Sequence, residues 1–472
     1  MEILNHLFQE QKRDSVAVKN NIAKLLNMDP KAFKAFEEAY QKQALDDRYI
    51  SENLFEINAK QAAGQRDRPQ LEEELNKLID RIVNELLAQT QVYEYDGKTV
   101  NQGRFALPEE ANVQPVTLDD INRFPIEVRP QLSGELMKVD ITEPSYLILL
   151  EQYQEYLKHP DSEIGKRNYH MFRQGLDILD MDKITYQIIG MNPNSIGVWL
   201  PPLVDAVMKQ NFFKIPKTTV IKVPMTLLQL TRCGYASLTP ATITIVDKFC
   251  QKAFSLDEAK EYFVKTGTYS SKFDFRNAYV HGVKEVRELG EYLLFIHFLA
   301  LQMASPLSSK QIYGVSTTNE WVVREFIPDK EGNPTIYKGM PLHTEYRVFV
   351  DFDSKKVIGV NPYWDPEVMT KRFAHEADAD SPHQIHDYIV YKAHQEVLMK
   401  RYDENVDAVC GNIEAMLGDV ALSGQWSIDV MQNGDDFWII DMGLAQNSAL
   451  NECVPRNLLK PVKENWLPTI CE

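Results

Sequence analysis

Hydrophobic and polar residues alternate most clearly in the segment from Gln425 to Leu450. Its first part has the two-residue period of a half-buried β-strand, with Trp426, Ile428 and Val430 alternating with Ser427, Asp429 and Met431. The pair Asn433-Gly434 is a strong hairpin-turn signal, and the apolar run 437–440 that follows ends at Asp441. The pattern predicts two neighbouring strands, each with one acid among apolar residues.

The rest of the chain has the pattern of mixed helices and strands. Apolar residues recur at helical spacing from Leu71 to Leu87, which predicts a helix packed on the main body in preference to a partner-docking helix. Further helices are expected at 136–157, 204–208, from residue 241, at 277–303 and at 389–417. Strands are expected at 215–224, 262–265, 321–327, 344–351 and 355–360, a strand and a second apolar segment within 184–200, and a linker with short extended pieces at 93–130.

Composition and charge narrow the class of protein. The chain has 472 residues, which is long enough for two or three domains, and 44% of them are hydrophobic. The formal net charge of -17 argues against a broad nucleic-acid-binding face. The cysteines are scattered and form no CxxC pair, which is typical of reduced thiols and not of a disulfide framework or a zinc site.

The sequence also bears on location in the cell. The N-terminus lacks the long apolar region of a signal peptide. The most apolar helical run, at 292–303, is too short to cross a bilayer. We therefore expect a cytoplasmic protein with no membrane partner and no nucleic-acid partner.

The two acids of the predicted hairpin are the first candidates for chemistry. A carboxylate among buried strand residues is costly unless it has a partner, and two carboxylates on adjacent strands repel each other. A divalent cation held by Asp429 and Asp441 would relieve both problems. Hard oxygen ligands of this kind suit magnesium, which is commonly shared with the phosphates of a substrate.

A second group of polar residues follows the predicted strand at 262–265. Lys265 ends this strand, and a turn rich in Gly, Thr and Ser leads to Ser270, Ser271 and Lys272. Such a turn can wrap a phosphate chain with backbone N–H groups and hydroxyls while the lysine neutralises the charge. No GxxxxGK[ST] occurs in the chain, so the turn is not a P-loop. Taken alone, a lysine that ends a strand is usually solvated.

Two later strands carry charged residues that bear on a ligand site. In the strand at 321–327, Arg324 is either a cation near phosphates or a surface arginine, and the two interpretations are level. In the strand at 344–351, Glu345 and Arg347 share one face. This acid and base can hold a ribose and a phosphate side by side. They can equally form an ion pair with no ligand, worth only about 0–1 kcal/mol when exposed.

These motifs, in this order, resemble the ATP-grasp superfamily. The IDVM strand that holds Asp429 resembles a core strand of D-alanine–D-alanine-ligase-type enzymes. The Lys-then-Ser-Ser-Lys order after 262–265 resembles the cell-division-cycle branch that assembles a eukaryotic translation initiation factor. The acid-aromatic-Arg-x-Phe-Val strand at 345–350 resembles one in that branch and in related phage and bacterial ATP-grasp proteins. The resemblance covers residues 215–450.

The resemblance implies a site for ATP and Mg²⁺ and assigns residues to it by position. The residues that it assigns are Lys222, Lys265, Ser270, Ser271 and Lys272 for the phosphates, Glu325, Phe326 and Ile327 for adenine, Glu345 for ribose, Lys265 and Arg347 for catalysis, and Asp429 and Asp441 for magnesium. Arg324 is a further candidate for the phosphates, at a place where the family seldom has an arginine.

The chain departs from the family pattern at two positions. The family's second hairpin strand usually ends Glu-x-Asn, with both residues on magnesium, whereas this chain has Gly443 in the last place. Gln446 or Asn447 would supply the missing ligand, or one metal contact is lost. Ligases of the D-alanine type also place an arginine where this chain has Ser427. In those ligases the arginine stabilises the tetrahedral intermediate. Either another cation does so in this chain, with Arg347, Lys371 and Arg372 as the candidates, or the chemistry differs.

The expected fold is α+β, an ATP-grasp fold in which two subdomains grip ATP, with a helical N-terminal extension. We expect the extension and a linker at 1–130, an N-terminal α/β substrate-side domain at 131–240 and the nucleotide-binding region at 241–472. The family's usual reaction predicts an ATP-dependent carboxylate–amine ligase that acts through an acylphosphate on an unidentified carboxylate or peptide or protein acceptor. The alternatives are an ATP-binding assembly factor for a protein client, an ATP-grasp kinase, and a structural protein that keeps the fold without nucleotide.

Overall fold

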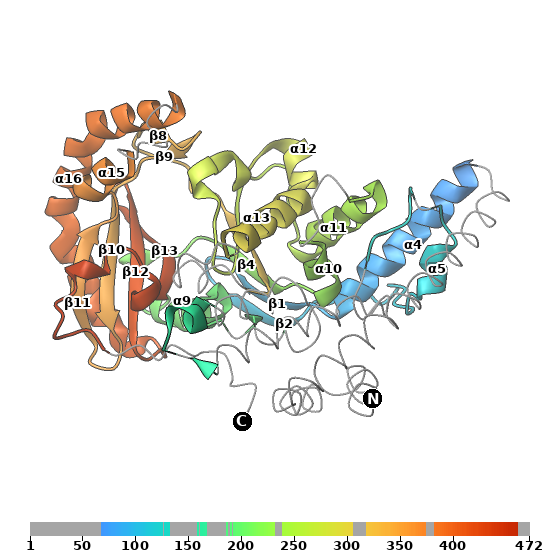
Figure 1. Cartoon of the computed structure of the whole chain (residues 1–472), viewed down its shortest axis with the longest axis horizontal. Helices are drawn as coiled ribbons and strands as arrows, with labels where there is room; N and C mark the ends of the chain where they lie inside the picture. Colours follow the sequence, from blue (N-terminus) through green and yellow to red (C-terminus); the bar gives the residue numbers. More distant parts are fainter. Residues whose placement is uncertain are drawn as a thin grey trace.

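The computed structural model describes residues 68–125, 127–132, 158–159, 161–167, 186, 189–190, 192–231, 238–304, 318–373 and 382–460. Within these residues the chain is a mixed α+β protein built on two larger sheets and a two-stranded ribbon (Figure 1). The helical pattern before residue 68 and the helix expected at 136–157 lie outside the described residues.

The first sheet has six strands, and each neighbouring pair is antiparallel. In spatial order they are β2 (Val100–Arg104), β1 (Gln91–Tyr95), β4 (Thr218–Lys222), β7 (Glu320–Glu325), β5 (Tyr262–Thr266) and β6 (Tyr279–Val280). The short extended pieces expected at 93–130 include β1 and β2, but these strands are not part of a linker, because β1 pairs with β4 over its full length. The sheet therefore takes strands from all three of the segments 1–130, 131–240 and 241–472.

Three helices cover one face of this sheet. α4 (Arg68–Ala88), α11 (Pro240–Ala253) and α13 (Leu289–Ala304) share one apolar cluster with Val264 of β5 and Trp321 of β7. The apolar stripe of α4 forms the contact, and Ile82 and Leu86 are completely buried. The prediction of a helix packed on the main body is confirmed.

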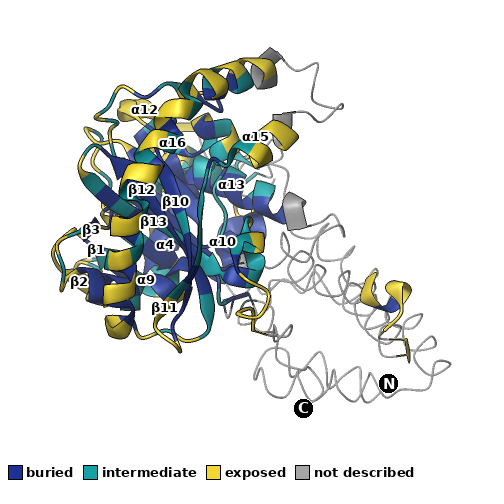
Figure 2. Ribbon diagram, turned by 90° about the vertical axis from the view of Figure 1, so that its left-hand side faces the viewer, coloured by how far each residue is buried: buried dark blue, intermediate teal, exposed yellow. Residues whose placement is uncertain are grey.

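The second sheet has five strands and lies beside the first. Its order is β11 (Lys356–Pro362), β10 (Glu345–Asp351), β12 (Gln425–Asn433), β13 (Asp436–Leu444) and β3 (Phe213–Lys214), with β13 and β3 parallel and the other pairs antiparallel. The long helix α16 (Pro382–Met416) packs on one face of it through residues such as Val409 and Ile413. Figure 2 shows β10 and β12 as largely buried, whereas α12 (Gly282–Arg287) and α15 (Pro366–Phe373) are largely exposed.

Helix α9 (Ile196–Val207) joins the two sheets. Its residues Trp199 and Leu203 belong to one apolar cluster with Val322 of the first sheet and Val348 of the second. The strand expected at the start of 184–200 is wrong at its described residues, since 186 and 189 are helical, whereas the turn expected at 192–194 is present and the second apolar segment is the start of α9. The apolar side chains of this segment meet a sheet on either side, which a helix satisfies better than a strand.

The predicted hairpin is confirmed as β12 and β13. A two-residue turn joins them, with Gly434 at a φ of 65° and Asn433 opposite Asp436. A glycine tolerates this left-handed conformation without a steric cost. β12 differs from the prediction in one respect, since it is buried on both faces and not half-buried.

A β-bulge near the middle of the hairpin changes which residues face each other. Val430 pairs with Ile439, as the turn dictates, but the next pair is Asp429 with Asp441. Ile440 is therefore the extra residue. Because successive side chains of a strand alternate between faces, this extra residue brings Asp441 to the same face as Asp429.

Shorter elements complete the fold. They are α5 (Leu118–Asn122), α10 (Met225–Leu230), the ribbon of β8 (Thr335–Ile336) and β9 (Met340–Pro341), and 3₁₀ helices at Lys272–Asn277, Leu417–Asp419, Ala445–Asn447 and Asn451–Cys453. Cys250, Cys410 and Cys453 are free thiols. Within the described part of the chain, no helix is both long enough and apolar enough to cross a membrane.

The packing of α4 gives a stability prediction. Ile82→Ala will lower the free energy of unfolding by about 2–5 kcal/mol, because it deletes a buried side chain and leaves a cavity. Urea denaturation followed by circular dichroism measures the change. Glu72→Ala on the solvent side of α4, where the side chain is 62% exposed, is the control and will change stability by less than about 0.5 kcal/mol. Equal midpoints for the two variants would show that α4 is not part of the core.

Candidate functional site

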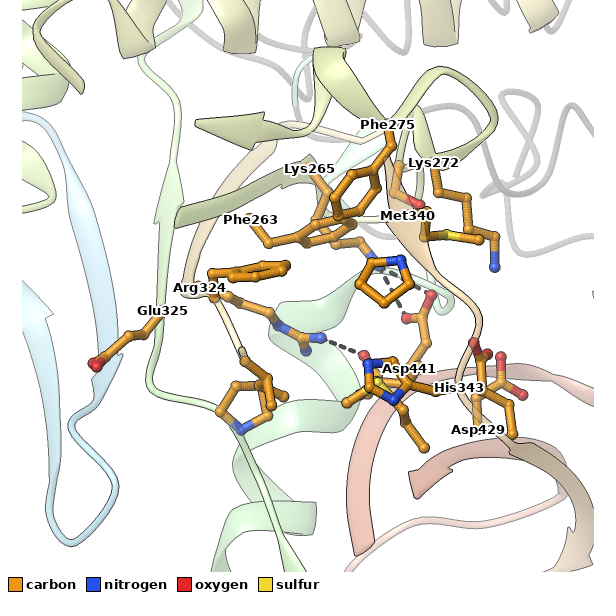
Figure 3. Close-up of a pocket in the computed structure, with 18 residues that line it drawn as sticks. Phe263, Lys265, Lys272, Phe275, Arg324, Glu325, Met340, His343, Asp429 and Asp441 are labelled. Carbon is orange, nitrogen blue, oxygen red and sulfur yellow. Dashed lines mark hydrogen bonds and ion pairs between the residues drawn. The ribbon is translucent and has the colours of Figure 1, made fainter. Parts of the chain in front are cut away.

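A cavity lies between the two sheets, where the ends of β5 and β7 face β10, β12 and β13 (Figure 3). Its volume is about 130 Å³. Most of the residues that the sequence assigned to a nucleotide line this one cavity: Lys265, Ser270, Lys272, Arg324, Glu325, Phe326, Ile327, Glu345, Asp429 and Asp441. The fold therefore brings together residues from four separate parts of the chain.

Asp429 and Asp441 lie opposite each other, and each already has a cationic partner. Arg347 donates from Nε to Oδ1 of Asp429 at 2.8 Å and from Nη2 to Oδ2 at 2.6 Å. Lys265 Nζ lies 3.0 and 3.1 Å from the two carboxylate oxygens of Asp441. Without a ligand, the two acids are therefore balanced by two protein cations. The assignment of magnesium to this pair stays a prediction.

Lys265 is a buried charge. It comes from β5 in the first sheet and reaches Asp441 in the second, with only 2% of its side chain exposed. The alternative of a solvated lysine is therefore wrong. Burial lowers the pKa of Lys265, and Asp441 offsets this only in part. Burial alone would raise the pKa of Asp441, but the charges of Lys265 and Arg324 outweigh it and hold that pKa below its ordinary value.

Arg324 is also buried, with 4% of its surface exposed, so the surface alternative is wrong for it too. Its Nη1 donates to the backbone carbonyl of Ile440, the extra residue of the β-bulge. Its Nε and Nη2 are buried and have no partner among the described residues. Burial lowers the pKa of Arg324 to about 10, which leaves it cationic at neutral pH. A charged group with unsatisfied donors lines the cavity.

Tyr363 is a member of the site that the sequence did not reveal. Lys272 Nζ donates to its hydroxyl and lies 4.2 Å from its ring centroid, and the Arg347 guanidinium lies 4.6 Å from the same centroid. The aromatic face is attractive to both cations. A lone tyrosine just after β11 carries no motif, so only the folded arrangement identifies it.

Glu345 faces the cavity and is 7% exposed. The ion pair between Glu345 and Arg347 of β10, an alternative that the sequence left open, does not form, since Arg347 pairs with Asp429 on the adjacent strand. Burial raises the pKa of Glu345 to about 7. This carboxylate therefore changes charge near neutral pH.

The other end of the cavity is apolar. Phe263, Phe275 and Met340 line it together with Phe326, and Figure 3 shows the side chain of Glu325 turned away from them. Glu325 instead pairs with Lys217 at 2.9 Å on the outer side of the strand. The assignment of this segment to adenine can thus rest on the backbone at Glu325 and the Phe326 ring, but not on the Glu325 carboxylate.

Four of the assigned residues lie outside the cavity lining, and one of them, Arg347, is linked to it through Asp429. Lys222 pairs in register with Glu320, at the opposite end of β7 from Arg324, so its assignment to the phosphates is wrong. Asn447 accepts a hydrogen bond from the Asn194 amide at 3.0 Å and does not reach the acid pair's cavity. Ser271 accepts a hydrogen bond from Asn277 at 3.3 Å and supports the turn instead of lining the cavity.

Comparisons with known proteins add a distant likeness. No protein-family model matches the chain, and no curated protein matches it. Among solved structures, the chain is similar to C-terminally truncated Cdc123 from Schizosaccharomyces pombe, with a TM-score of 0.34 and 16% sequence identity. A second structure of Cdc123 from the same organism gives a TM-score of 0.32 and 15% sequence identity. Each comparison covers 57% of this chain and 94% of the Cdc123 chain. A similarity at this level carries no conclusion about function.

The buried Glu345 predicts a pH dependence of stability. Its folded pKa of about 7 exceeds its ordinary 4.5, so its contribution is present below pH 4.5 and is lost as the pH rises through 7. Glu345→Gln cannot ionise and will be more stable than the wild type at pH 8, by up to about 3 kcal/mol, and similar at pH 5. Urea denaturation at both pH values measures this difference.

The control for that measurement is Glu404→Gln on α16, where the side chain is 57% exposed. Its stability should follow the wild-type pH curve. If Glu345→Gln also follows the wild-type curve between pH 5 and pH 8, the folded pKa of Glu345 is not raised.

Proposed function

We propose that this chain binds Mg-ATP in the cavity between its two sheets. The observation that carries the proposal is the Arg324 guanidinium, a buried cation with two nitrogens that lack partners. Leaving such donors unsatisfied is costly. A phosphate chain offers several oxygens at once and would accept from both nitrogens. Lys265 and Lys272 line the same cavity and supply further positive charge.

The apolar end of the cavity supports a purine ring as the remainder of the ligand. Phe263, Phe275 and Phe326 present aromatic faces, and Met340 adds a polarisable contact. Glu345, beside the cations, would accept hydrogen bonds from ribose hydroxyls. An apolar slot that leads to a cationic end fits a nucleotide better than it fits a simple inorganic anion.

The pair of acids supports magnesium as the metal. Asp429 and Asp441 present carboxylate oxygens from opposed strand positions, the hard ligands that Mg²⁺ prefers when it is shared with phosphates. The ion would supply positive charge against the phosphate oxygens. Arg347 holds Asp429 in a fixed orientation through two hydrogen bonds.

Within that function we favour nucleotide binding in the service of a protein client, as in an assembly factor, over ligation. The position where D-alanine-type ligases keep an arginine is Ser427, whose Oγ lies 2.6 Å from Ser448 Oγ. A buried pair of hydroxyls offers no cation to stabilise a tetrahedral intermediate. Gly443 likewise provides no side chain for a second metal contact. The carboxylate–amine ligase and the kinase are the alternatives.

The reaction class is open to a direct test. Incubation of the purified protein with Mg-ATP and carboxylate, amine and peptide acceptors will leave bound ATP intact, because the site lacks the ligase arginine. Ion-exchange chromatography of the nucleotide and mass spectrometry of the acceptors measure this. ADP formed in step with a condensed acceptor would establish the ligase, and ADP formed with a phosphorylated acceptor would establish the kinase.

Arg324→Met tests the nucleotide site itself. The variant keeps the length of the side chain and removes its charge, so the affinity for a fluorescent ATP analogue should fall roughly 100-fold, the effect of two charge-assisted hydrogen bonds. Without nucleotide, the free energy of unfolding should change by less than about 1 kcal/mol, since one lost hydrogen bond is offset by removal of a buried charge with unpaired donors.

Lys222→Met is the matched control, because Lys222 lies on the neighbouring strand β4, opposite Glu320 at the other end of β7 from Arg324, and does not line the cavity. It should bind the ATP analogue like the wild type. If Arg324→Met binds as tightly as Lys222→Met, the cavity does not hold the phosphates and the proposed function is wrong.

A further inference from the structure

Side chains from the first sheet's side reach across the cavity to the second sheet. Lys265 contacts Asp441, Arg324 contacts the carbonyl of Ile440, and Lys272 contacts the hydroxyl of Tyr363. Figure 3 draws the first two of these contacts as dashed lines. The ligand-free site is thus closed by its own cations.

The size of the cavity agrees with this closure. A volume of about 130 Å³ is well below the roughly 300–1,000 Å³ that pockets for drug-sized ligands occupy. A nucleotide bound here would therefore compete with the cross-cavity contacts for the same cations. We expect at least one bridging cation to exchange its protein partner for the ligand.

Among the cross-cavity contacts, that of Lys265 occupies the carboxylate of Asp441, a candidate metal ligand. The Lys265 ammonium has no acceptor among the described residues other than the two oxygens of Asp441. A divalent cation bound by Asp441 alone would lie beside this buried ammonium, and like charges at such a short distance repel each other. The other acid, Asp429, is paired with Arg347. Each of the two acids is therefore paired with a protein cation before a ligand binds.

The charges that face the acids favour an anion first. Lys265, Lys272, Arg324 and Arg347 surround Asp429, Asp441 and Glu345. A metal ion alone would add to a positive excess. A triphosphate would make the net charge of the site negative. Its oxygens would also give Lys265 new acceptors, which releases Asp441.

We propose, on the basis of the proposed nucleotide site, that Lys265 makes this protein selective for a metal–triphosphate complex over free metal. Phosphate oxygens take the place of Asp441 as the acceptors of the Lys265 ammonium, and the freed carboxylate then contacts the cation. No covalent bond is formed or broken. Lys265 is accordingly a specificity-determining residue for the metal as well as a phosphate contact.

Manganese is the probe, because its electron paramagnetic resonance signal reports free ion. The wild-type protein should bind Mn²⁺ at least about tenfold more tightly with ATP present, relative to both protein-free ATP and protein without nucleotide. Lys265→Met should bind Mn²⁺ without nucleotide at least about tenfold more tightly than the wild type. In this variant, ATP should also raise the affinity for Mn²⁺ by a smaller factor than in the wild type.

Lys272→Met is the matched control. It removes one charge from the same cavity but leaves the contact of Lys265 with Asp441 intact. A gain in affinity for Mn²⁺ alone that is confined to Lys265→Met supports the proposal. An equal gain in both variants would mean that total charge, and not this contact, excludes the metal, and would overturn it.

Measurements on the wild type decide the matter even if a variant fails to fold. Equal affinity for Mn²⁺ with and without a fluorescent ATP analogue, while the analogue itself binds, would overturn the proposal and leave the nucleotide site standing. Failure of the analogue to bind, with or without Mn²⁺, would reject the proposed function instead.

Discussion

The contact between Lys265 and Asp441 is the interaction on which the candidate site depends. It joins β5 of one sheet to β13 of the other through a charge that is almost fully buried. Removing water from the lysine charge is expensive, and its attraction to Asp441 offsets the cost only while both partners stay in place. The contact therefore links the two sheets across the cavity, and its loss must be compensated by another anion near the lysine.

The position of the sheets themselves is set elsewhere, by α9. Its apolar face packs against both sheets, and its first turn is anchored to the start of β7, where Glu320 accepts from Gly197 N at 2.9 Å and from Ser195 Oγ at 2.6 Å. The close fit extends to Gly267, where an added Cβ would clash with Ser195 Oγ. The cavity thus lies between two sheets that both pack against α9.

Much of the candidate site was predictable, because its residues belong to short local patterns. Lys265 ends an apolar strand, and Asp429 and Asp441 interrupt apolar strands, so the exception to each pattern marks a residue that needs a partner. Lys222 also ends its strand, but it pairs with Glu320, at the end of β7 away from Arg324, and lies outside the cavity lining. Tyr363 has no pattern and enters only because folding places its ring against Lys272 and Arg347.

The sequence by itself determined the hairpin, most of its neighbouring strands and the packed helices, since alternation and helical spacing are local properties of the chain. The tertiary structure alone decided that Asp441 shares a face with Asp429. The turn would align Asp429 with Ile440, and the β-bulge at Ile440 shifts that register by one residue. The bulge is stabilised by a contact far along the chain, because the freed Ile440 carbonyl accepts from the buried Arg324, and no local pattern contains that information.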